Sequence, residues 1–127
     1  MKLKLKILDH LFTIHRLSPG SSIPKQVFDC EFYSISKTDE ELSIVCPSAI
    51  MLDSKNSEDG WSCIKVLGPL DFSLTGILAD ISGVLSKAGI SIFAISTFDT
   101  DYILVKSDKT MAAKAALQKA EYIFIIN

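Results

Sequence analysis

The sequence predicts an α+β protein with antiparallel sheets and helices on one face of each sheet. Three observations carry this prediction. Residues 76–88 place apolar side chains at helical spacing, and residues 109–120 form a second segment rich in alanine and lysine. Short β-branched and aromatic runs surround these two segments from Trp61 onward. The resulting order of strand, helix, strand, strand, helix, strand is the ferredoxin-like arrangement.

The helix predicted from Gly76 to Ala88 is the clearest element of the chain. Gly89 follows it, and glycine is the residue most often found just past a helix C-terminus. Gly76 itself costs about 1 kcal/mol relative to alanine in a helical turn. It therefore indicates either close approach of a ligand or another backbone, or tight packing of the helix on the sheet. The apolar stripe comprises Ile77, Leu78, Ile81, Val84, Leu85 and Ala88, with Asp80, Ser82, Ser86 and Lys87 left for water.

The strand predicted from Ile90 to Phe98 has apolar side chains on both faces. Ile90, Ile92 and Ala94 share one face, whereas Phe93 and Ile95 share the other. A sheet covered on one side only does not need both sets, so we expect the second face to be covered by the other half or by another subunit. The remaining expected elements are a turn at 99–101, a strand at 102–106, a helix at 109–120 capped by Ser107 or Asp108, and a strand at 121–126.

The first half repeats the same order in a less regular form. We therefore expect two units in tandem, residues 1–60 and residues 61–127, and the strand at 61–67 fits either unit. Residues 53–60 are charged and polar throughout and are the best linker candidate. The other expected elements are strands at 2–8, 11–17, 32–37 and 42–46, a short helix at 25–28, and one helical turn at 48–51.

Composition excludes several classes of function. The net charge of −2 and a pI near 5.6 argue against nucleic-acid binding. The apolar runs fall far short of the ~20 residues that span a bilayer. Lys2, Lys4 and Lys6 alternate with apolar residues, which indicates a strand rather than a signal peptide. We expect a cytoplasmic protein that binds neither nucleic acid nor membrane.

The cysteines and histidines form no recognisable metal or catalytic motif. Cys30, Cys46 and Cys63 are widely spaced, and the latter two lie in apolar runs where cysteine usually acts as a core residue. His10 and His15 lie in or beside predicted strands. We therefore expect no enzyme, no metal and no cofactor, although the sequence leaves open a cysteine–histidine pair formed in three dimensions.

Two motifs, Gly68–Gly76 (GPLDFSLTG) and Ile90–Tyr102 (ISIFAISTFDTDY), carry a family resemblance. The sequence resembles the ACT domain family, whose first loop and helix commonly read D-x-P-G-x-L, with G-I-x-I opening the next strand. It is most similar to short bacterial ACT proteins related to the ACT modules of animal cytosolic arginine sensors. Two extra residues separate the aspartate from the glycine, and Thr75 replaces the usual proline. The residues that match are Asp71, Gly76, Leu78, Gly89, Ile90 and Ile92.

The candidate site consists of two loops that the resemblance places face to face. A helix N-terminus suits a carboxylate, and aspartate side chains suit an ammonium group. An α-amino acid carries both charges, and in related ACT proteins this loop and strand bind amino acids, commonly between two ACT units. Alternatively, Asp71 and Ser73 cap the helix, and the later aspartates only form a turn. The candidate ligand-binding residues are Asp71, Phe72, Ser73, Leu74, Thr75, Gly76, Ser96, Thr97, Phe98, Asp99 and Asp101.

The resemblance implies a regulatory module that binds a small molecule, most plausibly an amino acid. It would consist of a degenerate ACT-like unit at residues 1–60 followed by an ACT domain at 61–127. We expect it to act on a separate protein partner or through homo-oligomerisation. Three aspartates exceed what one ammonium needs, so we rank basic amino acids first, neutral ones second and acidic ones last. The alternative is an ACT-fold interaction or structural module without a small ligand.

Overall fold

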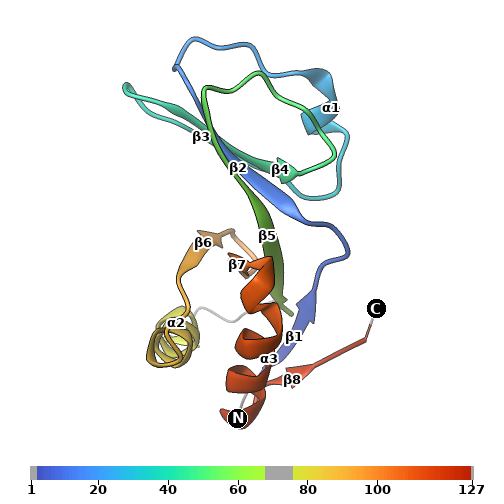
Figure 1. Ribbon diagram of the computed structural model, residues 1–127, viewed down its shortest axis with the longest axis vertical. Helices are drawn as coiled ribbons and strands as arrows, with labels where there is room; N and C mark the ends of the chain where they lie inside the picture. The colour runs from blue at the N-terminus through green and yellow to red at the C-terminus, as the bar shows by residue number, and fades with distance from the viewer. Residues whose placement is uncertain (1–2, 68–75, 127) are drawn as a thin grey trace. The chain divides into compact units, whose positions relative to one another are not determined.

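The computed structural model describes residues 3–67 and 76–126 of the chain. These residues form eight β-strands, three α-helices and one short 3-10 helix, which confirms the mixed α+β class. The chain divides into two compact units, a larger one of residues 1–9 and 62–127 and a smaller one of residues 10–61. Strand β5 (Asn56–Val66) is continuous in Figure 1 and contributes its first half to the smaller unit and its second half to the larger.

The larger unit contains a five-stranded arrangement in the order β8-β1-β5-β7-β6. Strand β1 pairs antiparallel with β5 and parallel with β8, and β6 and β7 form an antiparallel hairpin. Without β1, this order is that of the ferredoxin-like arrangement, so β1 is an insertion between its first and last strands. The bounds are β1 Lys4–Ile7, β6 Ile92–Ser96, β7 Asp101–Lys106 and β8 Ile123–Phe124.

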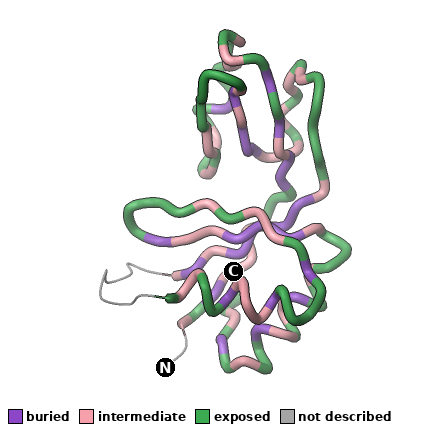
Figure 2. The backbone as a smooth tube through the Cα atoms, turned by 90° about the vertical axis from the view of Figure 1, so that its left-hand side faces the viewer, coloured by how far each residue is buried: buried purple, intermediate pink, exposed green. Residues whose placement is uncertain are grey.

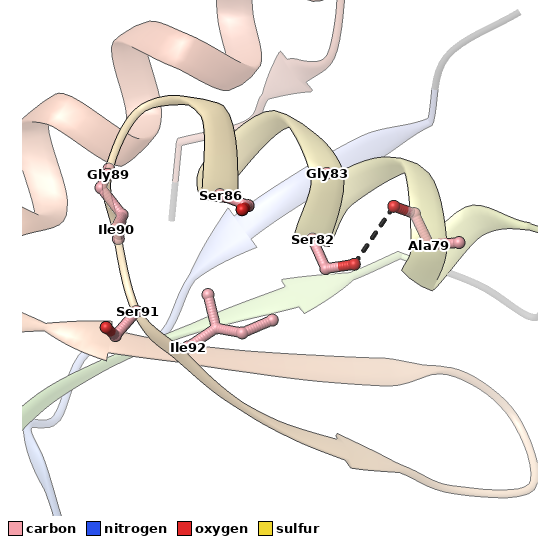
Figure 3. A pocket seen from close by; sticks show the side chains of 8 residues that line it. All are labelled: Ala79, Ser82, Gly83, Ser86, Gly89, Ile90, Ser91 and Ile92. Carbon is pink, nitrogen blue, oxygen red and sulfur yellow. Dashed lines mark hydrogen bonds between the residues drawn. The ribbon is translucent and has the colours of Figure 1, made fainter.

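Helix α2 (Ile77–Lys87) ends in a glycine turn that returns the chain to the sheet. Gly89 has a φ of 76°, and the Ile90 amide donates to the Leu85 carbonyl at 2.9 Å. This six-residue hydrogen bond is the Schellman motif, and it places Ile90 and Leu85 in the same core. Figure 3 shows the turn between α2 and the start of β6. The predicted stop at Gly89 is therefore confirmed.

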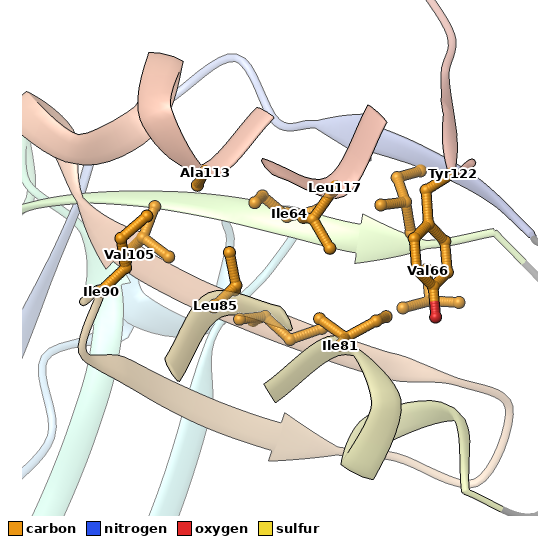
Figure 4. Close-up of a cluster of buried hydrophobic side chains, with 11 residues drawn as sticks. Ile64, Val66, Ile81, Leu85, Ile90, Val105, Ala113, Leu117 and Tyr122 are labelled. Atoms are coloured by element: carbon orange, nitrogen blue, oxygen red, sulfur yellow. The ribbon is translucent and has the colours of Figure 1, made fainter. Parts of the chain in front are cut away.

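The core of the larger unit lies between the sheet and its two long helices. Figure 4 shows side chains of α2 and of α3 (Thr110–Lys119) directed toward β5 and β7. Ser107 and Asp108 do not cap α3 by their side chains, because residues 107–109 form the 3-10 helix and α3 begins at Thr110. The buried core residues are Leu5, Ile64, Val66, Ile81, Leu85, Ile90, Ile103, Val105, Ala113, Leu117 and Tyr122.

The smaller unit has the antiparallel order β3-β4-β2-β5. Its elements run β2 (Phe12–Leu17), α1 (Lys25–Phe28), β3 (Ser34–Lys37), β4 (Leu42–Pro47) and the first half of β5. Residues 48–50 form a turn instead of the expected helical turn. Figure 2 shows exposed and buried stretches alternating along the chain. The buried residues of the smaller unit lie within its strands and α1. The core gathers Leu17, Val27, Leu42, Ile44 and Cys46.

Two sequence-based boundaries differ from those of the structure. Residues 56–60 of the predicted linker form the start of β5, where Glu58 pairs with Ile14 and Asn56 with Arg16. Their side chains are mostly exposed, so no apolar alternation marked the strand. The compact units also do not follow a single division at residue 60, because β1 pairs with the second half of β5.

Candidate functional site

Gly76 starts helix α2 in a left-handed conformation, with a φ of 83°. Its carbonyl accepts from the Asp80 amide at 2.8 Å, and glycine has no side chain with which to cap the helix. The amides of the first helical turn have no intrahelical acceptor and carry partial positive charge. Of the loop predicted to bind the ligand, Asp71, Phe72, Ser73, Leu74 and Thr75 lie outside the described residues.

The structure gives a reason for Gly76 that differs from the close packing considered above. A Cβ atom placed there would meet no described atom within 4 Å. The backbone conformation, rather than crowding, therefore requires glycine at this position. Among residues 3–67 and 76–126, none fills the space on the side of Gly76 where a Cβ would lie.

The second candidate segment forms the turn between β6 and β7. The Thr97 amide donates to the Thr100 carbonyl at 2.8 Å, and the Thr100 amide donates to Thr97 Oγ1 at 3.2 Å. Ser96 Oγ donates to Asp101 Oδ1 at 2.6 Å. Phe98 and Asp99 at the tip are exposed. The five predicted residues of this segment are thus brought together, and two of them, Ser96 and Asp101, contact each other directly.

Thr100 joins this turn to the segment that leads into the first loop, and sequence reasoning missed it. Its side chain is 5% exposed, and Oγ1 donates to the Val66 carbonyl at 2.5 Å. Val66 is the last residue of β5, just before the chain continues toward residues 68–75. The turn is therefore anchored beside the point where the first loop begins. No sequence pattern marks such a threonine, because its partner is a backbone carbonyl 34 residues away.

A second missed contact holds the first turn of α2. The buried Tyr122 hydroxyl donates to a carboxylate oxygen of Asp80. Burial, together with this hydrogen bond, raises the pKa of Tyr122 above its ordinary value. Tyr122 therefore stays protonated as a donor and links α2 to the segment that enters β8.

A hollow of about 530 Å³ lies between α2 and the start of β6. Figure 3 shows small side chains of α2 on one wall and Ile92 on the other. None of the described residues that line this hollow carries a charge, so it offers an amino acid no ion pair. Its shape and neutrality suit packing of another segment. The lining residues are Ala79, Ser82, Gly83, Ser86, Gly89, Ile90, Ser91 and Ile92.

Cys46, Cys63 and His15 have the surroundings of core residues. Burial raises the pKa of Cys46 to about 11 and that of Cys63 to about 12, so neither supplies a thiolate nucleophile at neutral pH. Both are fully buried core residues, as the sequence indicated. His15 Nδ1 lies 2.8 Å from Ser54 Oγ rather than beside a thiol.

Residues 3–67 and 76–126 show neither a metal-binding cluster nor a membrane-spanning helix. This part of the chain contains no group of three or more His, Cys, Asp or Glu side chains that could hold a metal ion. None of its helices is long and apolar enough to cross a bilayer.

Comparison with known proteins adds independent observations. Residues 56–119 match the model of the ACT domain, and residues 10–50 match a second model described as an N-terminal domain. The chain is 32% identical over 125 residues to the cytosolic arginine sensor for mTORC1 subunit 1 of Pongo abelii. That match covers 91% of this chain but only 38% of the relative.

Solved structures show the same fold. A protein from Agobacterium tumefaciens has a TM-score of 0.91 and 40% identity, covering all of this chain and 95% of the other. A structure of aspartokinase alpha and beta subunits has a TM-score of 0.65 over 94% of this chain and 98% of the other, and at 16% identity it bears on fold alone.

The family match spans the elements that frame the candidate site. It begins at Asn56, the first residue of β5, and ends at Lys119, the last residue of α3. Between these limits lie the start of α2 and the turn between β6 and β7. The chain belongs to the ACT domain family.

Proposed function

We propose that the protein is a regulatory module that binds an amino acid between the loop ending at Gly76 and the turn at residues 96–101. The observation that carries this proposal is the ACT match over residues 56–119, which includes that turn and the start of α2. Two features of the described residues support it. No described atom would contact a Cβ at Gly76 at the start of α2, and Thr100 anchors the turn beside the end of β5.

The proposed ligand is a zwitterion held by its two charges. The α-carboxylate would accept from the free amides at the start of α2, and Asp71, Asp99 or Asp101 would accept from the ammonium group. Basic amino acids rank first because a second cation would use the remaining aspartates. The relative named as an arginine sensor favours the same order. Charge-assisted hydrogen bonds of this kind each contribute about 1.5–3 kcal/mol.

We also propose that the chain contains two ACT-like units in tandem. In the smaller unit, the order β3-β4-β2-β5 is the ferredoxin-like strand order with its second helix replaced by residues 48–55. We therefore interpret the smaller unit as a degenerate ACT-like unit and the larger one as the ACT domain. In this proposal the two ACT-like units meet close to residue 60, and β5 contributes a strand to each of them.

Self-association through β6 is the proposed route of assembly. Among the described strands, β6 pairs with β7 alone, so its other edge is open. Its sequence, IFAIS, has none of the charges or prolines that protect edge strands. The neutral hollow lined by α2 lies beside it. A second copy would present the same uncharged edge about a two-fold axis, without like-charge repulsion.

The signal would pass to another protein rather than to a reaction within this chain. We propose a non-enzymatic role in the cytoplasm, acting on a separate partner or through the subunit interface. The second candidate is an ACT-fold interaction module without a small ligand. Its support is that Ser96, Thr97, Thr100 and Asp101 already hydrogen-bond within the turn, as a purely structural turn would.

A thermal-shift screen against the twenty amino acids tests the proposal. A ligand that binds only the folded state raises its stability by about 2.7 kcal/mol at a hundredfold excess over the dissociation constant. We expect arginine or lysine to give the largest rise in melting temperature, followed by neutral amino acids. A flat response to all twenty at millimolar concentration would favour the module without a ligand.

A further inference from the structure

Strand β8 forms one edge of the sheet in the larger unit. Among the described strands it pairs with β1 alone (Figure 1). The Ile123 amide donates to the Leu3 carbonyl at 3.3 Å, and the Ile125 amide donates to the Leu5 carbonyl at 2.9 Å. Successive residues of a strand direct their backbone groups to opposite sides, so the amide and carbonyl of Phe124 point away from β1.

The segment around β8 lacks the features that protect edge strands. Residues 122–126 read YIFII, without a charge or a proline. The exposed fraction is 55% for Ile123, 38% for Ile125 and 95% for Ile126. Outward backbone groups with exposed apolar side chains beside them are a template for the addition of another strand.

The two faces of the sheet differ in charge beside this edge. Phe124 is in register with the buried Leu5, so its ring lies on the helix-covered face. There the Nζ atom of Lys114 lies 5.7 Å from the centroid of the Phe124 ring. Ile123 and Ile125 alternate with Phe124 and therefore lie on the opposite face. The edge thus has a cation on one side and exposed isoleucines on the other.

We propose that the β8 edge, defined by Ile123, Phe124 and Ile125 with the neighbouring Lys114, binds an extended segment of another protein as an added strand. This segment would place apolar side chains beside the two isoleucines and acidic side chains, on its other face, beside Lys114. The inference rests on the proposed role of a module that acts on a separate partner, and it names the surface that this partner would use.

Other occupants match the edge less well. A lipid bilayer would cover the isoleucines but leave the amide and carbonyl of Phe124 without hydrogen-bond partners. A small anion would pair with Lys114 but not with the outward backbone groups. A second copy paired antiparallel at Phe124 would bring its own Lys114 to the same face, where like charges oppose pairing.

A fluorescently labelled synthetic peptide of alternating valine and glutamate provides the probe, and anisotropy at low salt follows its binding. The decisive comparison is between Phe124→Pro and Phe124→Ala. Both variants lose the ring, but only proline also removes the outward amide, and neither loses an amide bond to β1. We expect Phe124→Pro to bind at least about tenfold more weakly than Phe124→Ala. Denaturation curves establish that both variants fold.

A second pair of variants tests the acidic half of the proposal without changing the strand. Lys114→Gln should weaken peptide binding about threefold and reduce its dependence on salt. Lys119→Gln is the control, because it removes the same charge from the last turn of α3 and should keep the wild-type affinity.

Four outcomes would overturn the inference. The first is equal peptide affinity of Phe124→Pro and Phe124→Ala, the second is equal effects of Lys114→Gln and Lys119→Gln, and the third is no binding by wild type at low salt. The fourth is a lower mass of Phe124→Pro than of Phe124→Ala in light scattering, which would assign the edge to a second copy. The probe is a peptide and β8 is separate from the proposed amino-acid site, so this test and the thermal-shift screen fail independently.

Discussion

Gly76 shows how one backbone angle connects the sequence to the proposed site. Its φ of 83° is costly for residues with a Cβ atom, by about 1–2 kcal/mol, although no described atom would collide with that Cβ. We therefore predict that Gly76→Val lowers the free energy of unfolding by about that amount, whereas Gly76→Asn lowers it less because asparagine tolerates the left-handed region. Urea denaturation of both variants measures the difference. Equal stability of Gly76→Val and wild type would contradict the conformational role.

His15 is a core histidine of the smaller unit with one hydrogen-bonded nitrogen. It is 6% exposed, and β2 places it opposite Ile44 and Ser57. Nδ1 contacts Ser54 Oγ, and Nε2 has no hydrogen-bond partner among the described residues. Burial lowers the pKa of His15 from its ordinary value of 6.5, because the protonated ring would lose its hydration.

The lowered pKa of His15 predicts that acid destabilises the protein. Below about pH 6.5 the unfolded chain takes up a proton at His15 that the folded chain does not, so the free energy of unfolding falls as the pH drops through that value. The fall ends only where His15 of the folded protein is protonated as well. We expect His15→Leu to flatten this part of the stability–pH profile. His10→Gln, at an exposed position, is the matched control and should keep the wild-type slope. Parallel profiles for His15→Leu and wild type would exclude His15 as the cause.

The structural role of a residue could be predicted from the sequence where that role depends on residues nearby in the chain. Gly89 ends α2 as expected, because a left-handed residue after the helix is a local requirement. Thr100 and Tyr122 could not be found in this way, because their partners Val66 and Asp80 are distant in sequence. The predicted ligand residues on the first loop stay predictions, and those on the turn now have a hydrogen-bonding context.

Strand β6 is the element on which the proposed assembly depends. Thr97 and Thr100 form a hydrogen-bonded pair at the turn. Along an antiparallel ladder, hydrogen-bonded pairs alternate with pairs whose amides and carbonyls point away from the partner strand. Ile95 is therefore bonded to β7, whereas the amide and carbonyl of Ala94 point to the open edge. A proline at Ala94 removes an outward donor without removing a bond to β7.

Ala94→Pro is accordingly predicted to convert an oligomer into monomers while the fold persists. Lys37→Pro is a suitable control, because the Thr38–Glu41 hydrogen bond places the Lys37 amide on the outer edge of β3. Light scattering at micromolar concentration measures the mass of each protein. A monomeric wild type, or an oligomeric Ala94→Pro variant of unchanged mass, would rule out assembly through β6.

Helices and strands with a strong apolar periodicity were predicted from the sequence, whereas those without it were missed. The stripe of α2 identified its core residues Ile81 and Leu85. The first half of β5 was assigned to a linker, because residues 56–59 are polar and exposed and only their pairing with β2 makes them a strand. The insertion of β1 between β5 and β8 was also missed, since strand order depends on contacts between distant segments.

At the scale of the whole molecule, the fold and family were accessible from sequence, whereas the ligand was not. Two motifs, Gly68–Gly76 and Ile90–Tyr102, were sufficient for the ACT resemblance, and the match over residues 56–119 confirms it. Ligand choice depends on a few side chains around a common backbone arrangement. The chain also spans only 38% of the length of the arginine-sensor relative, so the activity of that whole protein does not transfer by likeness.

The proposed charge pattern makes a prediction about the ligand as a whole. The start of α2 should bind the α-carboxylate, so arginine should bind more tightly than agmatine, which lacks only that group. Loss of one charge-assisted hydrogen bond corresponds to about 1.5–3 kcal/mol, or roughly ten- to a hundredfold in the dissociation constant. Glutamate should bind more weakly than arginine, because the turn carries aspartates.

Isothermal titration calorimetry of the wild-type protein with arginine and with agmatine tests amino-acid binding most directly. We predict saturable binding of arginine and at least about tenfold weaker binding of agmatine. Equal affinity for the two would contradict the role of the helix start. Heat from neither compound, nor from any other amino acid at millimolar concentration, would contradict amino-acid binding itself.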